Sequence, residues 1–442
     1  MNENACVYQY RNPDIEKMPR KDLENLQLSN LRTAVGWALR TPFYRERLPT
    51  VGINSPDDIK SLEDFRRIPY TTKDDLAKGY PFGFLGVALD DVVRLHSSSG
   101  TTGNPKTIYY TAGDLKRWSE LLARGIWAIG CTKKDVFQNM ISYGLFTGGL
   151  GLHAGGEEVG MLVIPSGSGN ITRQLKLMQD FGTTVVHATP NFLLHFESKM
   201  KEEGVAMESL KLKKAITGVE PHSEDTRRRI ERLLNIDVYN SYGLTEMNGP
   251  GVGYECQAKD GMHLWEDCYI GEIIDPETLK PLPDGETGEL VVTCLCREAS
   301  PILRYRTRDL TSFYTDPCVC GRTHRRLSRL TGRTDDMLII NGVNVFPSQI
   351  EEVVMRMSEV GNNYLIVVEK EGALDRLIVK VEVGPDIFTD DSRTLNALKE
   401  KILRTIQAVI SIKPKIELQE SGSLPVAEGK AVRVHDKRPK DI

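Results

Sequence analysis

The chain has few aromatic residues, no excess of positive charge and no long hydrophobic run. Aromatic residues make up 7% of its 442 residues, and 57 Lys and Arg face 61 Asp and Glu. The resulting formal charge of −4 gives no general attraction to nucleic acid or to anionic lipid. No apolar run approaches the roughly 18 residues that a bilayer span needs, and the first twenty residues lack the layout of a secretory signal. We therefore expect a cytoplasmic protein without nucleic-acid or membrane partners.

The eight cysteines are too sparse for a small secreted domain held together by disulfides. Reduced thiols and a metal site are the alternatives that this number leaves open. Hydrophobic residues make up 40% of the chain and charged residues 27%, which is typical of a globular protein. A chain of this length can form two hydrophobic cores.

The hydrophobic pattern changes along the chain and predicts two domains. Residues 1–90 have the pattern of helices and turns, and from about residue 92 to 300 short apolar runs alternate with amphipathic stretches. This alternation predicts a large α/β domain of layered sheets and helices over residues 1–333. The pattern of residues 334–442 predicts a smaller α+β domain. Its boundary with the large domain lies in a polar hinge at residues 332–336. Within it, the capping-box spacing of Ser348 and Glu351 predicts the start of a helix.

The strongest local motif is the stretch S-S-S-G-T-T-G-N-P-K at residues 97–106, between two apolar, strand-like runs. Small hydroxyl residues and glycines allow successive backbone N–H groups to surround an anion, and a lysine adds a charged donor. The motif is not a Walker A loop, because Pro105 replaces the glycine that such a loop needs before its lysine. A flexible hairpin loop is the alternative to this phosphate cradle. The candidate phosphate-binding residues are Ser98, Ser99, Gly100, Thr101, Thr102, Gly103 and Lys106.

This loop resembles the phosphate loop of the adenylate-forming superfamily, which includes acyl-CoA synthetases, luciferases and peptide-synthetase adenylation domains. The other signatures of that superfamily follow in the same order, as Y-N-S-Y-G-L-T-E at 239–246, Y-R-T-R-D at 305–309, G-R-T-D-D at 332–336 and G-K at 429–430. Within the superfamily, the segments 143–153, 304–310, 317–324 and 332–351 resemble the phenylacetate–CoA ligase family.

The resemblance implies ATP-dependent, AMP-forming ligation of an aromatic, phenylacetate-like acid to coenzyme A through an acyl-adenylate. ATP, Mg²⁺ and CoA would then be needed, and a homodimer is the assembly to test. One alternative is an adenylating enzyme that passes its acyl group to a carrier protein or another nucleophile. A second alternative is a regulatory nucleotide-binding module without catalysis, which the presence of Glu246, Asp309 and Lys430 disfavours.

The chemistry of adenylation suggests roles for several motif residues. Glu246 offers a hard oxygen ligand for Mg²⁺ beside Thr245, and Tyr242 offers a flat face for adenine. Asp309 can accept hydrogen bonds from the ribose hydroxyls, and Arg333 would lie close to the same nucleotide. The resemblance implies the same roles, adds Lys430 as the catalytic lysine, and extends the nucleotide site to Glu220, Pro221, Asn240, Ser241 and Gly243. Taken alone, a lysine in a basic tail such as Lys430 is usually a solvated charge.

The glycine-rich run at 143–151 is assigned by the resemblance to the acid pocket, with Phe146 against the aryl ring and Tyr143 and Gly218 beside it. A hairpin that lies on a membrane is the alternative for this run. The sequence departs from the family pattern at 141–142 and at His222, which leaves the exact acid open. In the small domain, the resemblance assigns Asp335 to the hinge and Gly342 to the CoA tunnel, although Gly342 could be a turn residue.

A second group of residues suggests a structural metal. Cys318 and Cys320 lie on a Pro- and Gly-bounded loop, and together with Cys256 and His263 they could form the Cys₃His tetrahedron typical of structural zinc. His324 is an alternative fourth ligand. The other alternative is ordinary packing of reduced thiols.

Overall fold

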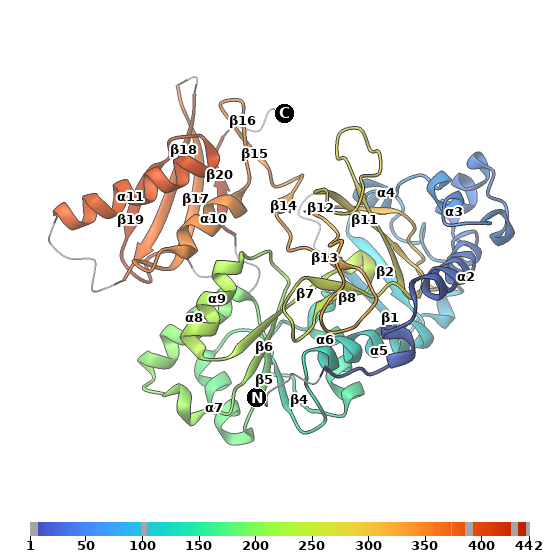
Figure 1. Cartoon of the computed structure of the whole chain (residues 1–442), viewed down its shortest axis with the longest axis horizontal. Helices are drawn as coiled ribbons and strands as arrows, with labels where there is room; N and C mark the ends of the chain where they lie inside the picture. The colour runs from blue at the N-terminus through green and yellow to red at the C-terminus, as the bar shows by residue number, and fades with distance from the viewer. Residues whose placement is uncertain (1–7, 99–103, 373, 385–391, 426–431, 439–442) are drawn as a thin grey trace.

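The computed structural model describes residues 8–98, 104–372, 374–384, 392–425 and 432–438. Figure 1 shows a large body, coloured blue to yellow, beside a smaller one in orange and red. The α-helices in these residues are α1 (Pro13–Glu16), α2 (Arg20–Ala38), α3 (Pro42–Arg47), α4 (Lys73–Lys78), α5 (Ala112–Ala128), α6 (Thr147–Val159), α7 (Ile171–Phe181), α8 (Pro190–Glu202), α9 (Glu224–Leu234), α10 (Pro347–Arg356) and α11 (Ser392–Ile410). Across the described ranges, no helix combines the length and the apolar character that crossing a bilayer requires.

The large body is built around a mixed sheet with the strand order β13-β9-β8-β7-β6-β5-β3-β4. The strands β4, β3, β5, β6 and β7 are parallel, and β8, β9 and β13 continue the sheet in antiparallel fashion. Because parallel strands end at the same edge of a sheet, the residues that follow β3, β5, β6 and β7 are close together. The bounds are β3 (Val136–Asn139), β4 (Leu162–Ile164), β5 (Val185–His187), β6 (Lys214–Thr217), β7 (Asp237–Leu244), β8 (Gly249–Glu255), β9 (Met262–Leu264) and β13 (Arg326–Leu327).

Two smaller sheets complete the large body. The hairpin β1 (Arg94–Ser98) and β2 (Lys106–Tyr110) flanks the predicted phosphate loop. An antiparallel sheet has the order β10-β11-β12-β14 and carries the Y-R-T-R-D motif on its third strand. Its strands are β10 (Tyr269–Ile274), β11 (Gly288–Cys294), β12 (Tyr305–Thr311) and β14 (Gly332–Arg333).

The glycine-rich run does not form a hairpin. From Thr147 it is the first half of α6, which packs against α5. A Cβ atom at Gly151 would lie 2.4 Å from the Trp118 ring, and one at Gly155 would lie 2.5 Å from Leu122 Cβ. The glycines therefore allow two buried helices to approach closely, and the membrane alternative is not needed to explain them.

The smaller body has its own hydrophobic core, from Leu338 to Ile416. Its four-stranded sheet has the order β19-β18-β17-β20, and α10 and α11 pack together. Its elements follow one another as helix, two strands, helix and strand, and the predicted fold class, a large α/β domain followed by a smaller α+β one, is confirmed. The boundary at 333/334 stays a prediction. The strands are β15 (Leu338–Ile340), β16 (Val343–Val345), β17 (Val360–Glu371), β18 (Leu374–Val383), β19 (Lys415–Gln419) and β20 (Val434–Asp436).

The predicted capping box of α10 is wrong. The helix begins at Pro347, with Phe346 as its N-cap residue, and the Gln349 side chain accepts a hydrogen bond from the Phe346 N–H at 3.0 Å. Proline is favoured at the first position of a helix, where its missing N–H costs nothing. Ser348 and Glu351 are therefore inside the helix and their side chains bond outward, to Thr331 and to α9.

Candidate active site

A cavity at the carboxyl ends of β6 and β7 collects most of the predicted nucleotide residues. It measures about 110 Å³. Val219 lines it with a φ of 72°, which is unusual for a β-branched residue and common at functional sites. The predicted residues that line it are Glu220, Pro221, Asn240, Ser241, Tyr242, Gly243, Asp309 and Arg333, together with Gly218, which was predicted for the acid pocket.

Asp309 is held by two of the other nucleotide candidates. Its Oδ2 accepts a hydrogen bond from the Tyr242 hydroxyl at 2.6 Å, and its Oδ1 lies 2.6 Å from Arg333 Nη1. Burial raises the pKa of Asp309, although Arg333 and the Tyr242 hydroxyl favour the charged form. Arg333 also contacts Asp335 at 2.9 Å, so the predicted hinge residue is tied to the nucleotide cavity. Each carboxylate oxygen has a second lone pair, which leaves Asp309 able to accept from a bound ribose.

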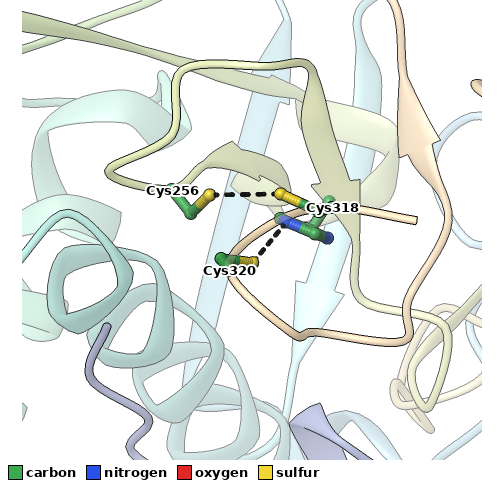
Figure 2. A group of neighbouring side chains, drawn as sticks. Cys256, Cys318 and Cys320 are labelled. Atoms are coloured by element: carbon green, nitrogen blue, oxygen red, sulfur yellow. Dashed lines mark hydrogen bonds between the residues drawn. The ribbon is translucent and has the colours of Figure 1, made fainter. Parts of the chain in front are cut away.

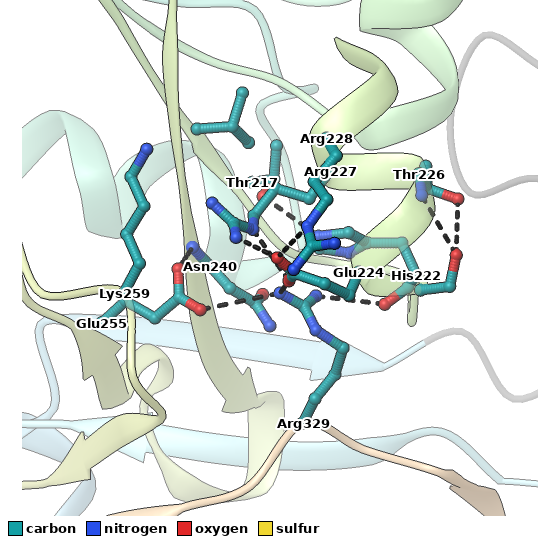
Figure 3. A network of polar contacts seen from close by, with 12 residues as sticks. Thr217, His222, Glu224, Thr226, Arg227, Arg228, Asn240, Glu255, Lys259 and Arg329 are labelled. Atoms are coloured by element: carbon teal, nitrogen blue, oxygen red, sulfur yellow. Dashed lines mark hydrogen bonds and ion pairs between the residues drawn. The ribbon is translucent and has the colours of Figure 1, made fainter. Parts of the chain in front are cut away.

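A network of charged side chains contacts residues that line the same cavity (Figure 3). Glu255 accepts a hydrogen bond from the Asn240 N–H at 2.7 Å. Arg329 donates to the His222 carbonyl oxygen at 3.1 Å and pairs with Glu224 at 3.0 Å. Asn240, His222 and Arg329 all line the cavity, so these partly buried contacts fix the position of its wall.

The second cavity adjoins the first and has a mostly apolar lining. It measures about 450 Å³, and Phe146, predicted for the acid pocket, lies on its wall. Gly218 and Tyr143 are not on this wall: Tyr143 bonds through its hydroxyl to Asn139 at 3.0 Å. The two cavities share the lining residues Val219, Ser241, Gly243 and Leu244.

Thr245 and Glu246 lie in the short turn after β7, which contacts the hairpin of β1 and β2. Thr245 lines the larger cavity, and Glu246 is buried with its Oε1 3.1 Å from the Tyr305 hydroxyl. The fully buried Arg297 donates to the Glu246 carbonyl oxygen at 2.6 Å, which fixes the backbone of this turn. Burial lowers the pKa of Lys106, and the charge of Glu246 opposes that shift.

The two strand-like runs beside the predicted phosphate loop form β1 and β2, which pair as an antiparallel hairpin. Ser98 is opposite Lys106 in the register of β1 and β2, and Lys106 is buried. The predicted residues Ser99, Gly100, Thr101, Thr102 and Gly103 lie outside the described residues, as does Lys430.

The smaller body contacts the large one close to these cavities. Glu351 on α10 accepts hydrogen bonds from the Ser223 N–H at 3.0 Å and from the Thr226 hydroxyl at 2.7 Å. Arg433 donates to Asn191 Oδ1 at 2.7 Å. Gly342 is exposed in the turn between β15 and β16 with a φ of 83°, and a Cβ atom there would meet no described atom within 4 Å. In this arrangement Gly342 lines neither of the two cavities described above.

The sequence analysis missed two polar residues, His187 on the wall of the larger cavity and its hydrogen-bond partner Asn139. His187 lines the cavity at the end of β5, and its Nδ1 lies 3.0 Å from Oδ1 of Asn139, the last residue of β3. Both side chains are buried. The available signal was a polar residue at the end of each of two neighbouring parallel strands.

The predicted metal ligands do come together. The ligand atoms of Cys256, His263, Cys318 and Cys320 all lie within 4.8 Å of one another, and all four residues are buried. Figure 2 shows the three cysteines converging, with 3.8 Å between the sulfurs of Cys256 and Cys318. The His263 Nε2 lies 3.3 Å from the Cys320 sulfur, and its Nδ1 lies 3.1 Å from the His324 carbonyl oxygen. This buried Cys₃His group could hold a metal ion.

His324 is not the fourth ligand of this group. Its Nδ1 accepts a hydrogen bond from the Glu266 N–H at 2.8 Å, and its Nε2 lies 3.0 Å from the Ile15 carbonyl oxygen. Both ring nitrogens are therefore used in hydrogen bonds.

Comparison with known proteins supports the predicted family. The model of AMP-binding enzymes matches residues 67–294, and that of the AMP-binding enzyme C-terminal domain matches residues 342–438. A phenylacetate-coenzyme A ligase of Thermus thermophilus is 43% identical over 435 residues, covering 95% of this chain and 98% of that protein.

Solved structures of a 2-hydroxyisobutyryl-CoA ligase are similar over nearly the whole chain. Its postadenylation state has a TM-score of 0.91 at 27% identity, covering 99% of this chain and 94% of that one. Its thioesterification state has a TM-score of 0.71 at 30% identity, covering 96% and 92%. The two bodies of this protein are therefore arranged more like the postadenylation state. With these matches in family, length and fold, the chain belongs to the phenylacetate-coenzyme A ligase family of AMP-binding enzymes.

Proposed function

We propose that the protein joins an aromatic, phenylacetate-like acid to coenzyme A in two steps. In the first step a carboxylate oxygen attacks the α-phosphorus of ATP, and pyrophosphate leaves. In the second step the CoA sulfur attacks the acyl carbon, and AMP leaves with the carboxylate oxygen. The observation that carries this proposal is the pair of adjoining cavities, one with a largely apolar lining and one lined by Asp309 and Arg333, which share Ser241, Gly243 and Leu244.

The described residues fit this reaction. Asp309 and Arg333 would hold the ribose, and Tyr242 would position the nucleotide through its bond to Asp309. Glu246 would bind Mg²⁺, because it offers a buried carboxylate next to Thr245, which lines the larger cavity. A bound Mg²⁺ would supply positive charge for the phosphate oxygens, where negative charge concentrates in the transition state.

The small domain would contribute to each step in turn. Lys430 would place an ammonium group between the acid and the α-phosphate in the first step. Gly342 would line the path of the CoA thiol in the second, after the small domain has moved about Asp335. The similarity to the postadenylation state supports this order, because Gly342 is exposed in the present arrangement.

Acid-dependent exchange of labelled pyrophosphate into ATP tests the first step. We expect exchange with phenylacetate or a related aromatic acid, and none without an acid. A panel of aryl, heteroaryl and aliphatic acids that gives no exchange would contradict the proposal. ATP binding without turnover across that panel would favour the alternative of a regulatory nucleotide-binding module. Acyl transfer to a carrier protein but not to CoA would favour the alternative of an adenylating enzyme with a different acyl acceptor.

For the Cys₃His group, zinc is the metal whose chemistry fits best. A tetrahedral zinc with Zn–S bonds of about 2.3 Å separates its sulfur ligands by about 3.8 Å. The sulfurs of Cys256 and Cys318 lie 3.8 Å apart. The His324 carbonyl oxygen would accept the Nδ1 proton of His263 and so leave Nε2 free to bind the metal. No open ligand position is needed, which favours a structural role.

Zinc would fasten the cysteine loop to the sheet of the large body, because Cys256 follows β8 and His263 lies on β9. The fully buried Arg322, next to this loop, pairs with Glu16 of α1 at 2.7 Å, and the Tyr10 hydroxyl donates to the Cys320 carbonyl oxygen. We expect about one zinc per chain in protein purified without added metal. Cys318→Ser should lose the zinc and lower the melting temperature, whereas the control Cys131→Ser, in a separate buried position, should keep the zinc. The zinc proposal would be contradicted if the wild-type protein contained no metal and Cys318→Ser left the melting temperature unchanged. The thiols would then be ordinary buried side chains.

A homodimer and a cytoplasmic location remain predictions from the sequence.

A further inference from the structure

A chain of hydrogen bonds runs from the surface of α6 to the wall of the acid cavity. Glu157 Oε1 lies 3.0 Å from His153 Nε2, and His153 Nδ1 lies 3.2 Å from the Tyr143 hydroxyl. The Asn139 Nδ2 atom lies 3.0 Å from that hydroxyl, and Asn139 Oδ1 lies 3.0 Å from His187 Nδ1. The chain ends at His187, which lines the cavity and is 1% exposed.

The orientation of the Asn139 amide determines which atoms of this chain donate and accept the hydrogen bond to His187. Asn139 Nδ2 also donates to the Gly149 carbonyl oxygen at 2.7 Å, which can only accept. This contact fixes the orientation of the Asn139 amide, so that its Oδ1 faces His187 as an acceptor. His187 must therefore carry its proton on Nδ1, and Nε2 keeps its lone pair. Burial lowers the pKa of His187 to about 3, so the ring stays neutral near pH 7.

No described residue donates a hydrogen bond to His187 Nε2. The hydroxyl groups on the same wall belong to Ser142, Thr147, Ser168, Thr189, Ser241 and Thr245, and a hydroxyl can either donate or accept. Ser142 and Ser168 bond to each other at 2.7 Å. The His187 nitrogen differs from these groups because it can only accept, and its proton position is set by buried neighbours.

We propose that His187 is a specificity-determining residue that selects acids carrying a hydrogen-bond donor, such as a ring hydroxyl group, inside the acid cavity. This inference rests on the proposed function and narrows its substrate class from aromatic acids to hydroxylated ones. An unsubstituted ring would displace water from Nε2 and leave a buried acceptor without a partner. A hydroxyl at the correct ring position would replace that water, whereas fluorine or a methoxy group at the same position brings no donor.

The test compares matched acids on the full-length protein. Phenylacetate and its hydroxy, fluoro and methoxy derivatives at each ring position are compared by kcat/KM in pyrophosphate exchange. We expect one hydroxylated isomer to exceed its fluorinated counterpart by about tenfold or more, which is the usual effect of one hydrogen bond to a buried group. His187→Met should reduce that ratio to near one, and Ser168→Ala, on the same wall, should leave it unchanged.

The ratio is internal to each variant, so a general loss of activity does not affect it. His187→Phe is the second variant, since it keeps a ring in the position if His187→Met folds poorly. Titration calorimetry with the same acids gives the comparison again without turnover. Equal binding of the hydroxylated and fluorinated acids, or a preference that survives in both His187 variants, would overturn the inference. Selective binding without exchange would contradict the proposed reaction but not the role of His187.

Discussion

Removal of the Glu351 carboxylate should slow the adenylation step and spare the thioester-forming step. Glu351 accepts two hydrogen bonds from the large body, from the Ser223 N–H at 3.0 Å and from the Thr226 hydroxyl at 2.7 Å. These bonds hold the small domain in the arrangement that resembles the postadenylation state. A rotated small domain would carry Glu351 away from both donors, so the bonds stabilise one arrangement only.

The size of the effect follows from these contacts. A hydrogen bond to a charged group contributes about 1.5–3 kcal/mol when it is well formed, and a half-buried group lies at the low end of that range. Part of the free energy of these two hydrogen bonds is recovered in the variant, because water takes the place of the carboxylate. We therefore expect Glu351→Ala to destabilise this arrangement by about 2 kcal/mol relative to the rotated one. That free energy corresponds to a change of about thirtyfold in the ratio of the two arrangements.

Two control variants separate this effect from a loss of folding. The Tyr364 hydroxyl, in the small domain, lies 3.2 Å from Glu351 Oε2, so Tyr364→Phe removes a contact that does not cross between the bodies. The second control is Glu352→Ala, which changes the adjacent residue on α10, a glutamate that pairs with Arg356 of the same helix. We expect Glu351→Ala to lose at least about tenfold in pyrophosphate exchange, and both controls to keep near-normal exchange. Thioester formation from supplied acyl-AMP and CoA should be unchanged or faster. Equal losses in both half-reactions, with an unchanged melting temperature, would refute the reasoning.

Substitutions at three other positions test the roles proposed for Gly342, Lys430 and Asp309. Gly342→Asn should keep pyrophosphate exchange and lose thioester formation, because asparagine tolerates the φ of 83° while its side chain would block the thiol. Gly372→Asn, in another turn with a φ of 65°, should affect neither step, and equal effects of both variants would argue for a turn role only. Lys430→Ala should lose about a hundredfold or more in exchange and still convert supplied acyl-AMP, unless the lysine is a solvated charge. Asp309→Asn should raise the KM for ATP by about tenfold or more, and an unchanged KM would contradict its assignment to the ribose.

Much of the fold could be predicted because its strands are short apolar runs bounded by turn residues. The runs at 161–165, 183–190, 213–221 and 288–296 each contain a strand of the structure. The strand β20 was missed, since it has three residues and only Val434 is hydrophobic. It pairs in parallel with β17, and that pairing depends on contacts far along the chain.

The candidate site could be predicted only where its residues occur in ordered motifs. Tyr242, Asp309 and Arg333 come from three such motifs, and the structure brings them into direct contact. His187 was missed because a single polar residue after a strand has no characteristic spacing. The contact of Glu351 with Ser223 joins positions 128 residues apart, and no local pattern indicates it.

The most direct test of the proposed reaction follows the carboxylate oxygen. An aromatic acid that supports exchange, labelled with ¹⁸O in its carboxylate, is incubated with ATP, Mg²⁺ and CoA, and the products are analysed by mass spectrometry. Attack of the carboxylate on the α-phosphorus predicts one ¹⁸O atom in AMP for each thioester formed, together with unlabelled pyrophosphate. Label in inorganic phosphate with formation of ADP, or thioester formation with unlabelled AMP, would contradict an acyl-adenylate intermediate.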